Sequence, residues 1–96
     1  MITEIALLNI KKDQSNLFET AFNKAQVIIS SMKGYTEHEL LKCLEEADKY
    51  VLIIRWQTLE DHTEGFRKNK MYHDWRNLLH HFYEPFPVVE HYEKVF

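Results

Sequence analysis

Apolar residues follow two different periods along the chain, and each period predicts a different kind of element. In residues 2–11 both the odd and the even positions are largely apolar. Side chains of a strand alternate between its two faces, so this pattern is typical of a strand that is covered on both faces. Residues 50–57 give a stronger strand pattern than residues 2–11, because the apolar run from Val51 to Ile54 is unbroken. Residues 35–44 and 87–95 alternate more weakly and predict two further strands.

A helical period occupies the segment between the first two strands. From Leu17 to Met32 apolar residues recur at spacings of three and four, which predicts an amphipathic helix of about four turns. Asp13 or Ser15 can cap its start. Gly34 follows where a left-handed residue ends many helices.

A second helical region follows the strongest strand. Thr58 and Asp61 resemble a capping box, which predicts a short helix to about Arg67. After a break at residues 68–69, the apolar positions between residues 70 and 83 predict another helix, which the two prolines just beyond it would stop.

The predicted order is β-α-β-β-α-β, an α+β, ferredoxin-like arrangement in one domain of residues 1–96. The polar segment 45–49 joins its two neighbouring strands as a hairpin. Two helices can cover only one face of a four-stranded antiparallel sheet. A bare apolar sheet face is rare on a soluble monomer. We therefore expect a homodimer in which two copies pack sheet against sheet.

Charge and composition exclude several classes of protein. The 12 basic and 15 acidic residues are interleaved and sum to −3, unlike the basic stripe of a nucleic-acid binder or the polybasic cluster of a membrane-surface protein. No apolar run approaches the ~20 residues that span a bilayer, and the N-terminus lacks the pattern of a signal peptide. The expected location is the cytoplasm.

The metal-binding residue types do not form a recognisable pattern. The single cysteine, Cys43, has no partner for a disulfide or a metal-binding pair, and we interpret it as a small apolar strand residue. His73 and His80 share a helix face with Asn77 but lie two turns apart. We expect a solvated polar face there and no metal site.

Three segments carry a resemblance to a known family, together with the opening apolar strand that has Asn9 near its end. They are Trp56–His62 at a strand-to-helix passage, Asn69–Trp75 at a helix start, and Pro87–Tyr92 in the last strand. With them the whole chain resembles the antibiotic biosynthesis monooxygenase superfamily of small dimeric α/β-barrel proteins.

The resemblance implies an oxygenase that needs no metal or flavin. A small aromatic or polyphenolic substrate with a ring hydroxyl would lose a proton, and its electron-rich anion would react directly with O₂. The protein then has to supply a dry aromatic pocket, a group that assists deprotonation, and donors that hold the anion. Such a pocket would lie within each subunit, between the helices and the sheet.

The candidate catalytic residues are Asn9, Trp56 and His62. Asn9 and Trp56 are polar groups at strand ends that need partners, and His62 titrates near neutral pH. His73 is a second possible proton acceptor. Substrate-binding candidates come from the second helical region; they are Phe66, Met71, Tyr72, Trp75, Arg76 and Leu79.

Structural roles compete with each of these assignments. Asn9 can bond to neighbouring backbone, Trp56 can be a core residue, and an aromatic stripe at helical spacing is often core. A non-catalytic small-molecule binding or stress-response module of the same fold is therefore the alternative function. Haem degradation is disfavoured, because the haem-degrading branch needs a helix Trp and a helix His where this chain has Gly65 or Phe66 and Trp75 or Arg76.

Overall fold

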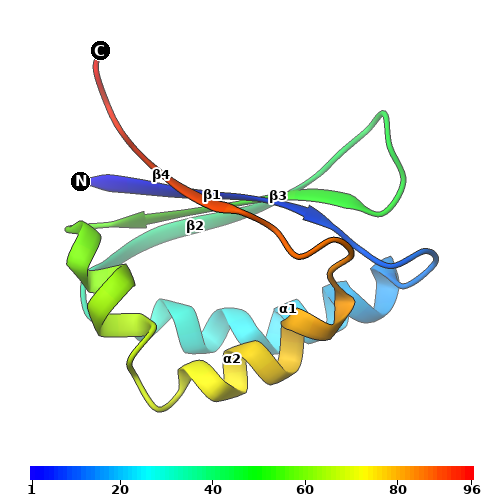
Figure 1. Ribbon diagram of the computed structural model, residues 1–96, viewed down its shortest axis with the longest axis horizontal. Coiled ribbons are helices and arrows are strands. Elements are labelled where there is room, and N and C mark those ends of the chain that lie inside the picture. The colour runs from blue at the N-terminus through cyan, green and yellow to red at the C-terminus, as the bar shows by residue number, and fades with distance from the viewer.

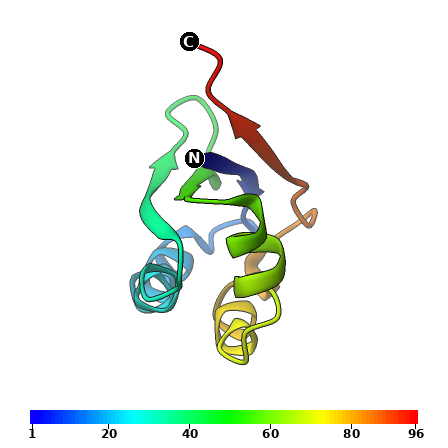
Figure 2. The ribbon, with the colours of Figure 1, turned by 90° about the vertical axis from the view of Figure 1, so that its left-hand side faces the viewer.

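The computed structural model describes residues 1–96 and contains four strands and four helical segments. The strands form one antiparallel sheet in the order β2-β3-β1-β4, and α1 and α2 lie on the same face of it (Figures 1 and 2). This is the ferredoxin-like β-α-β-β-α-β topology predicted above. The elements are β1 (Ile2–Asn9), α1 (Ser15–Ser30), β2 (Tyr35–Lys42), β3 (Lys49–Trp56), the π-helical turn η1 (Asp61–Phe66), α2 (Tyr72–Leu79), the 3₁₀ turn η2 (His80–Phe82) and β4 (Val89–Glu93).

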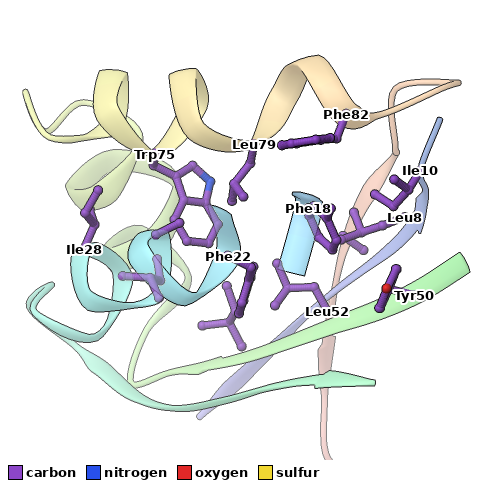
Figure 3. Close-up of a cluster of buried hydrophobic side chains, with 14 of the residues drawn as sticks. Leu8, Ile10, Phe18, Phe22, Ile28, Tyr50, Leu52, Trp75, Leu79 and Phe82 are labelled. Carbon is purple, nitrogen blue, oxygen red and sulfur yellow. The ribbon is translucent and has the colours of Figure 1, made fainter. Parts of the chain in front are cut away.

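The core fills the space between the sheet and the two helices (Figure 3). Alternate residues of the central strands β1 and β3 point into it, among them Leu8 and Leu52. From the helices, Phe18 is fully buried and Trp75 nearly so. Burial of each such side chain stabilises the fold by about 1.5–3 kcal/mol, so this one face holds the subunit together.

The opposite face of the sheet has no covering element in the subunit (Figure 1). The strand residues that alternate with the core residues point to this face, including Leu7, which is 53% exposed. We call this set the open-face patch; its members, which pair across three strands, are Ile5, Leu7, Leu41, Val51 and Ile53.

The start of α1 differs from the prediction. Neither Asp13 nor Ser15 caps the helix; the N-cap residue is Gln14, and its side chain makes no capping hydrogen bond. Instead the Ser15 hydroxyl donates to the carboxylate of Asp48 in the β2–β3 loop, and the backbone N–H of Asp13 donates to the same carboxylate. The predicted cap was wrong because a charged acceptor from a distant loop competes for the serine hydroxyl.

Gly34 has the predicted left-handed conformation, but it does not end the helix directly. Helix α1 ends at Ser30, and Gly34, with φ +83°, makes the turn into β2. The capping box is confirmed: the N–H of Thr58 donates to Asp61 Oδ2 at 3.2 Å, and the N–H of Asp61 donates to Thr58 Oγ1 at 3.2 Å. A Cβ on Gly34 would overlap the side chain of Asp61. The turn and the box therefore depend on each other.

The variant Gly34→Ala should lower the free energy of unfolding by about 1–3 kcal/mol, because alanine is strained at positive φ and its methyl group displaces Asp61 from the capping box. Gly65→Ala is the matched control, since a Cβ there meets nothing closer than 3.7 Å, and it should be neutral or slightly stabilising. Urea denaturation of the two variants measures the difference. Equal stabilities would contradict this account of the turn.

The second helical region is less regular than predicted. The short helix after the capping box is present as η1, and the break near residues 68–69 is confirmed. The predicted helix of residues 70–83 is instead α2 followed by η2. Trp75, Leu79 and Phe82 are all buried in the core, as their spacing predicts, whereas Met71 at the start is 38% exposed.

Candidate functional site

A cavity of about 410 Å³ lies between the sheet and the second helical region. Its volume falls in the range of sites for small organic ligands. The lining comes from β1, β3, η1, α2, η2 and the segment that leads into β4; its residues are Glu4, Ala6, Leu8, Leu52, His62, Arg67, Tyr72, Trp75, His80, Tyr83, Phe86, Pro87 and Val89.

A buried carboxylate, that of Glu4, is the most unusual group in this lining. Glu4 shares the inward face of β1 with Ala6 and Leu8, and only 6% of its surface is exposed. The indole N–H of Trp56 donates to Glu4 Oε1 at 2.9 Å. Trp56 ends β3, and its ring is completely buried, so the sheet holds the carboxylate in place.

Two histidines, His62 and His91, extend the polar group that begins at the carboxylate of Glu4. Nε2 of His62, on η1, lies 3.4 Å from Glu4 Oε1, and its ring stacks on Trp56 at a centroid distance of 5.4 Å. The other ring nitrogen, Nδ1, forms a hydrogen bond of 2.7 Å with Nε2 of His91 on β4. Strand register explains this grouping, because Glu4 and His91 are cross-strand partners of the β1–β4 pair.

Burial shifts the pKa values of these groups in opposite directions. It raises the pKa of Glu4 to about 7, although the Trp56 hydrogen bond and the charge of Arg67 lower it in part. Burial, with the charges of Arg67 and His91, lowers the pKa of His62 to about 3. Near neutral pH His62 is therefore uncharged, and the carboxyl group of Glu4 exchanges its proton readily. Glu4, rather than His62, is the group suited to accept a proton in the cavity.

Aromatic rings and hydrogen-bond donors form the rest of the wall. Trp75 and Tyr72 from α2 line the cavity together with His80 and Tyr83, while Arg67 is exposed at the rim. Burial raises the pKa of the Tyr83 hydroxyl above its usual value, so it stays protonated and can donate. The cavity thus offers flat apolar surfaces for a ring and donors for an oxygen atom of that ring.

The structure brings several of the candidate residues together. His62, Tyr72 and Trp75 line the cavity, and Trp56 lies behind Glu4 and binds it. Phe66 is buried between the rings of Trp56 and Trp75, at centroid distances of 6.0 and 5.5 Å, so it supports the wall from behind.

The other candidates lie away from this cavity. Asn9 is on the outward face of β1, because its position in the strand has the opposite parity to that of Glu4, and it lines a hollow on the open face. Leu79 is a fully buried core residue, and Met71 is half-exposed outside the lining. Arg76 is exposed and hydrogen-bonded to His73 Nδ1 at 2.8 Å, so neither of this pair reaches the site.

Five polar groups of the site were not among the candidate residues: Glu4, Arg67, His80, Tyr83 and His91. A signal for Glu4 was present, since it has the same strand parity as Ala6 and Leu8 and therefore shares their apolar face of β1. His91 gave no such signal, because its neighbour His62 is 29 residues away and only the register of β4 joins them.

No group of three histidine, cysteine, aspartate or glutamate side chains is arranged to hold a metal ion. None of the helices has the length and hydropathy of a membrane span.

Comparison with known proteins gives the family of this chain. Residues 1–78 match the family described as "Antibiotic biosynthesis monooxygenase". The chain belongs to this family. A relative in Bacillus subtilis (strain 168), the uncharacterized protein YczJ, is 55% identical over 95 residues, which cover 99% of this chain and all of YczJ.

Solved structures of the antibiotic biosynthesis monooxygenase family share the fold. A Bordetella bronchiseptica protein that carries the family's name superposes with a TM-score of 0.93 at 26% identity, over 99% of this chain and 97% of the other. SnoaB, a cofactor-independent oxygenase from Streptomyces nogalater, superposes with a TM-score of 0.74 at 15% identity, over 98% of this chain and 95% of its own. At that identity the likeness to SnoaB shows the fold alone.

Proposed function

We propose that the protein is a cofactor-independent monooxygenase, or a quinol oxidase, acting with O₂ on a small aromatic substrate that carries a ring hydroxyl. One observation carries the proposal: a buried carboxyl group with a pKa of about 7, Glu4, lines an aromatic cavity of about 410 Å³. Membership of the antibiotic biosynthesis monooxygenase family supports the same reaction class.

In the proposed reaction the carboxylate of Glu4 accepts the proton of the substrate's hydroxyl or activated C–H group. Tyr72 and Tyr83 donate to the substrate's oxygen and stabilise the anion that forms. The anion gives its electrons to O₂. In the monooxygenase reaction a ring CH₂ group becomes C=O and the second oxygen atom leaves as water; in the oxidase reaction a quinol becomes a quinone and O₂ becomes hydrogen peroxide. No metal or flavin takes part.

We also propose that two copies pack through the open-face patch and close the sheets into a dimeric α/β barrel. The patch is apolar, it spans three strands, and no element of the subunit covers it (Figure 2). The cavity lies on the other face of each sheet, so each subunit of the homodimer would keep a complete site.

Oxygen uptake with a panel of dihydroxynaphthalenes, anthrones and quinols tests the function. We expect uptake above the buffer rate that rises with protein concentration and persists after treatment with a chelator. Mass spectrometry after reaction under ¹⁸O₂ separates the two reactions, because only the monooxygenase places ¹⁸O in the organic product, whereas the oxidase places it in hydrogen peroxide.

The same panel distinguishes the alternative, a non-catalytic binding or stress-response module. A ligand that binds the folded state raises the melting temperature as its concentration rises. Ligand-induced shifts without oxygen uptake for any compound would support the binding module and contradict the enzyme.

A further inference from the structure

A chain of three polar side chains leads from the cavity to the edge of the sheet. It begins at Glu4 in the cavity lining and continues through His62, which is 4% exposed. It ends at His91, which is half-buried on β4, the edge strand of the sheet. The two links are 3.4 Å from Glu4 Oε1 to His62 Nε2 and 2.7 Å from His62 Nδ1 to His91 Nε2.

We propose that Glu4, His62 and His91 form a proton relay that carries a proton between the cavity and solvent at β4, with His91 as the exit. The identity of the proton rests on the proposed function, since it is the one taken from the substrate. His91 does not line the cavity, so it is a positioning and relay residue that acts through His62.

The transfer needs two proton movements and leaves His62 neutral. Protonated Glu4 gives its proton to His62 Nε2 while His62 Nδ1–H gives its proton to His91 Nε2. Glu4 is then a carboxylate again, His62 has exchanged one neutral tautomer for the other, and His91 carries the positive charge. Release of the Nδ1 proton to solvent then leaves neutral His91 in its Nε2–H tautomer, so each ring has exchanged one neutral tautomer for the other, and both rings have to exchange back before the next transfer. No oxidant or further reactant is needed.

Two polar groups near Glu4 offer no alternative route for this proton. The indole N–H of Trp56, which binds Glu4 Oε1, is a donor only and cannot accept a proton. The guanidinium group of Arg67 carries only N–H donors and offers no acceptor for a proton. The 3.4 Å link is longer than a good hydrogen bond, but such links are often long in unliganded proteins and shorten in complexes.

Charged and titratable groups face the relay from each neighbouring element. Arg67 follows η1, Tyr72 belongs to α2, and Tyr83 and His80 precede β4. The positive charge of Arg67 disfavours a second positive charge on His62 or His91. This arrangement favours the path in which His62 stays neutral and His91 releases its charge quickly to water.

Nitrogen-15 NMR of the histidine rings tests the relay without any substrate. In the wild-type protein we expect His62 to be mostly the Nε2–H tautomer above pH 8 and to gain the Nδ1–H tautomer as the pH falls through about 7, where Glu4 takes up a proton. In His91→Phe, Nδ1–H has no acceptor, so the ring should stay in the Nε2–H form at every pH. His81→Phe, which replaces an exposed histidine outside the cavity, should behave as the wild type.

A kinetic measurement with a second variant separates transfer from structure. His91→Ala should slow oxygen uptake by roughly 10- to 100-fold and increase the solvent deuterium isotope effect, and added imidazole should restore the rate. A purely structural histidine would show no such rescue.

Two separate results decide the relay and the function. A single His62 tautomer at all pH values in the wild type, or an unchanged response in His91→Phe, would overturn the relay even if oxygen uptake is observed. Tautomer exchange in a protein that consumes no oxygen with any substrate would retain the relay and remove the monooxygenase.

Discussion

Replacement of Glu4 by glutamine should lower the rate of oxygen uptake by about 10²- to 10⁴-fold, with little change in KM. The amide has nearly the same shape as the carboxyl group, and its oxygen can still accept the hydrogen bond from Trp56 Nε1. The amide cannot accept the substrate's proton. The loss should therefore fall on kcat, because the substrate still binds to the same aromatic walls.

Stability measurements on the same variant provide the control for folding. The pKa of Glu4 is about 7 in the folded protein and near 4.5 in the unfolded chain, so the folded state binds more protons between these values. Stability from this group is complete below pH 4.5 and is lost as the pH rises through 7. Glu4→Gln removes that loss and should be more stable than the wild type at pH 8 by about 2–3 kcal/mol.

His62 has the opposite effect on stability. Its pKa is about 3 in the folded protein against 6.5 in the unfolded chain, so the unfolded chain binds the extra proton and stability rises with pH between these values. In the wild type, between pH 4.5 and 6.5, Glu4 makes stability fall with rising pH while His62 makes it rise. In Glu4→Gln only the rise due to His62 remains, and urea denaturation at several pH values measures it.

Two further results bear on Glu4→Gln. Glu45→Gln, at an exposed glutamate of the β2–β3 loop, should leave both activity and the pH profile of stability unchanged. A Glu4→Gln protein that consumes oxygen at the wild-type rate would show that another group removes the substrate's proton, and Glu4 would then be a structural residue.

The fold was predictable from the sequence because local pattern and global topology agree. The unbroken apolar run in β3, the helical stripe of α1 and the capping box of Thr58 and Asp61 each specify one element. Errors occurred where a distant residue decided the outcome. The start of α1 is the clearest case, since Ser15 binds Asp48 rather than the helix backbone.

The site was predictable only in part, for the same reason. Trp56 and His62 come from one continuous passage of the chain, and their proximity follows from a strand that leads into a helix. Glu4 and His91 join them through strand pairing, which depends on register, and a shift of one residue between β1 and β4 would have placed the two side chains on opposite faces of the sheet. Asn9 shows the same rule, because its parity in β1 places it on the opposite side from Glu4.

Disruption of the open-face patch should convert a dimer into a monomer. We expect the wild-type protein to sediment at twice the chain mass of 11.6 kDa at micromolar concentration, and Ile53→Lys to sediment at the mass of one chain. Ile53 lies opposite Ile5 on β1 and Glu39 on β2, so it occupies the middle of the exposed sheet face. A lysine there would bring a charge into the apolar interface with only Glu39 beside it as a possible partner, and taking that charge out of water costs several kcal/mol in each copy.

The variant separates assembly from folding, because Ile53 has the opposite parity to the core residues Leu52 and Ile54 and does not enter the core. Circular dichroism should therefore show a folded Ile53→Lys chain, and Thr20→Lys on the exposed side of α1 should remain a dimer. A wild-type protein that sediments as one chain would contradict the dimer. If the monomeric variant still takes up oxygen, each subunit holds a complete site, as expected for a cavity that lies beneath the helices and away from the open face.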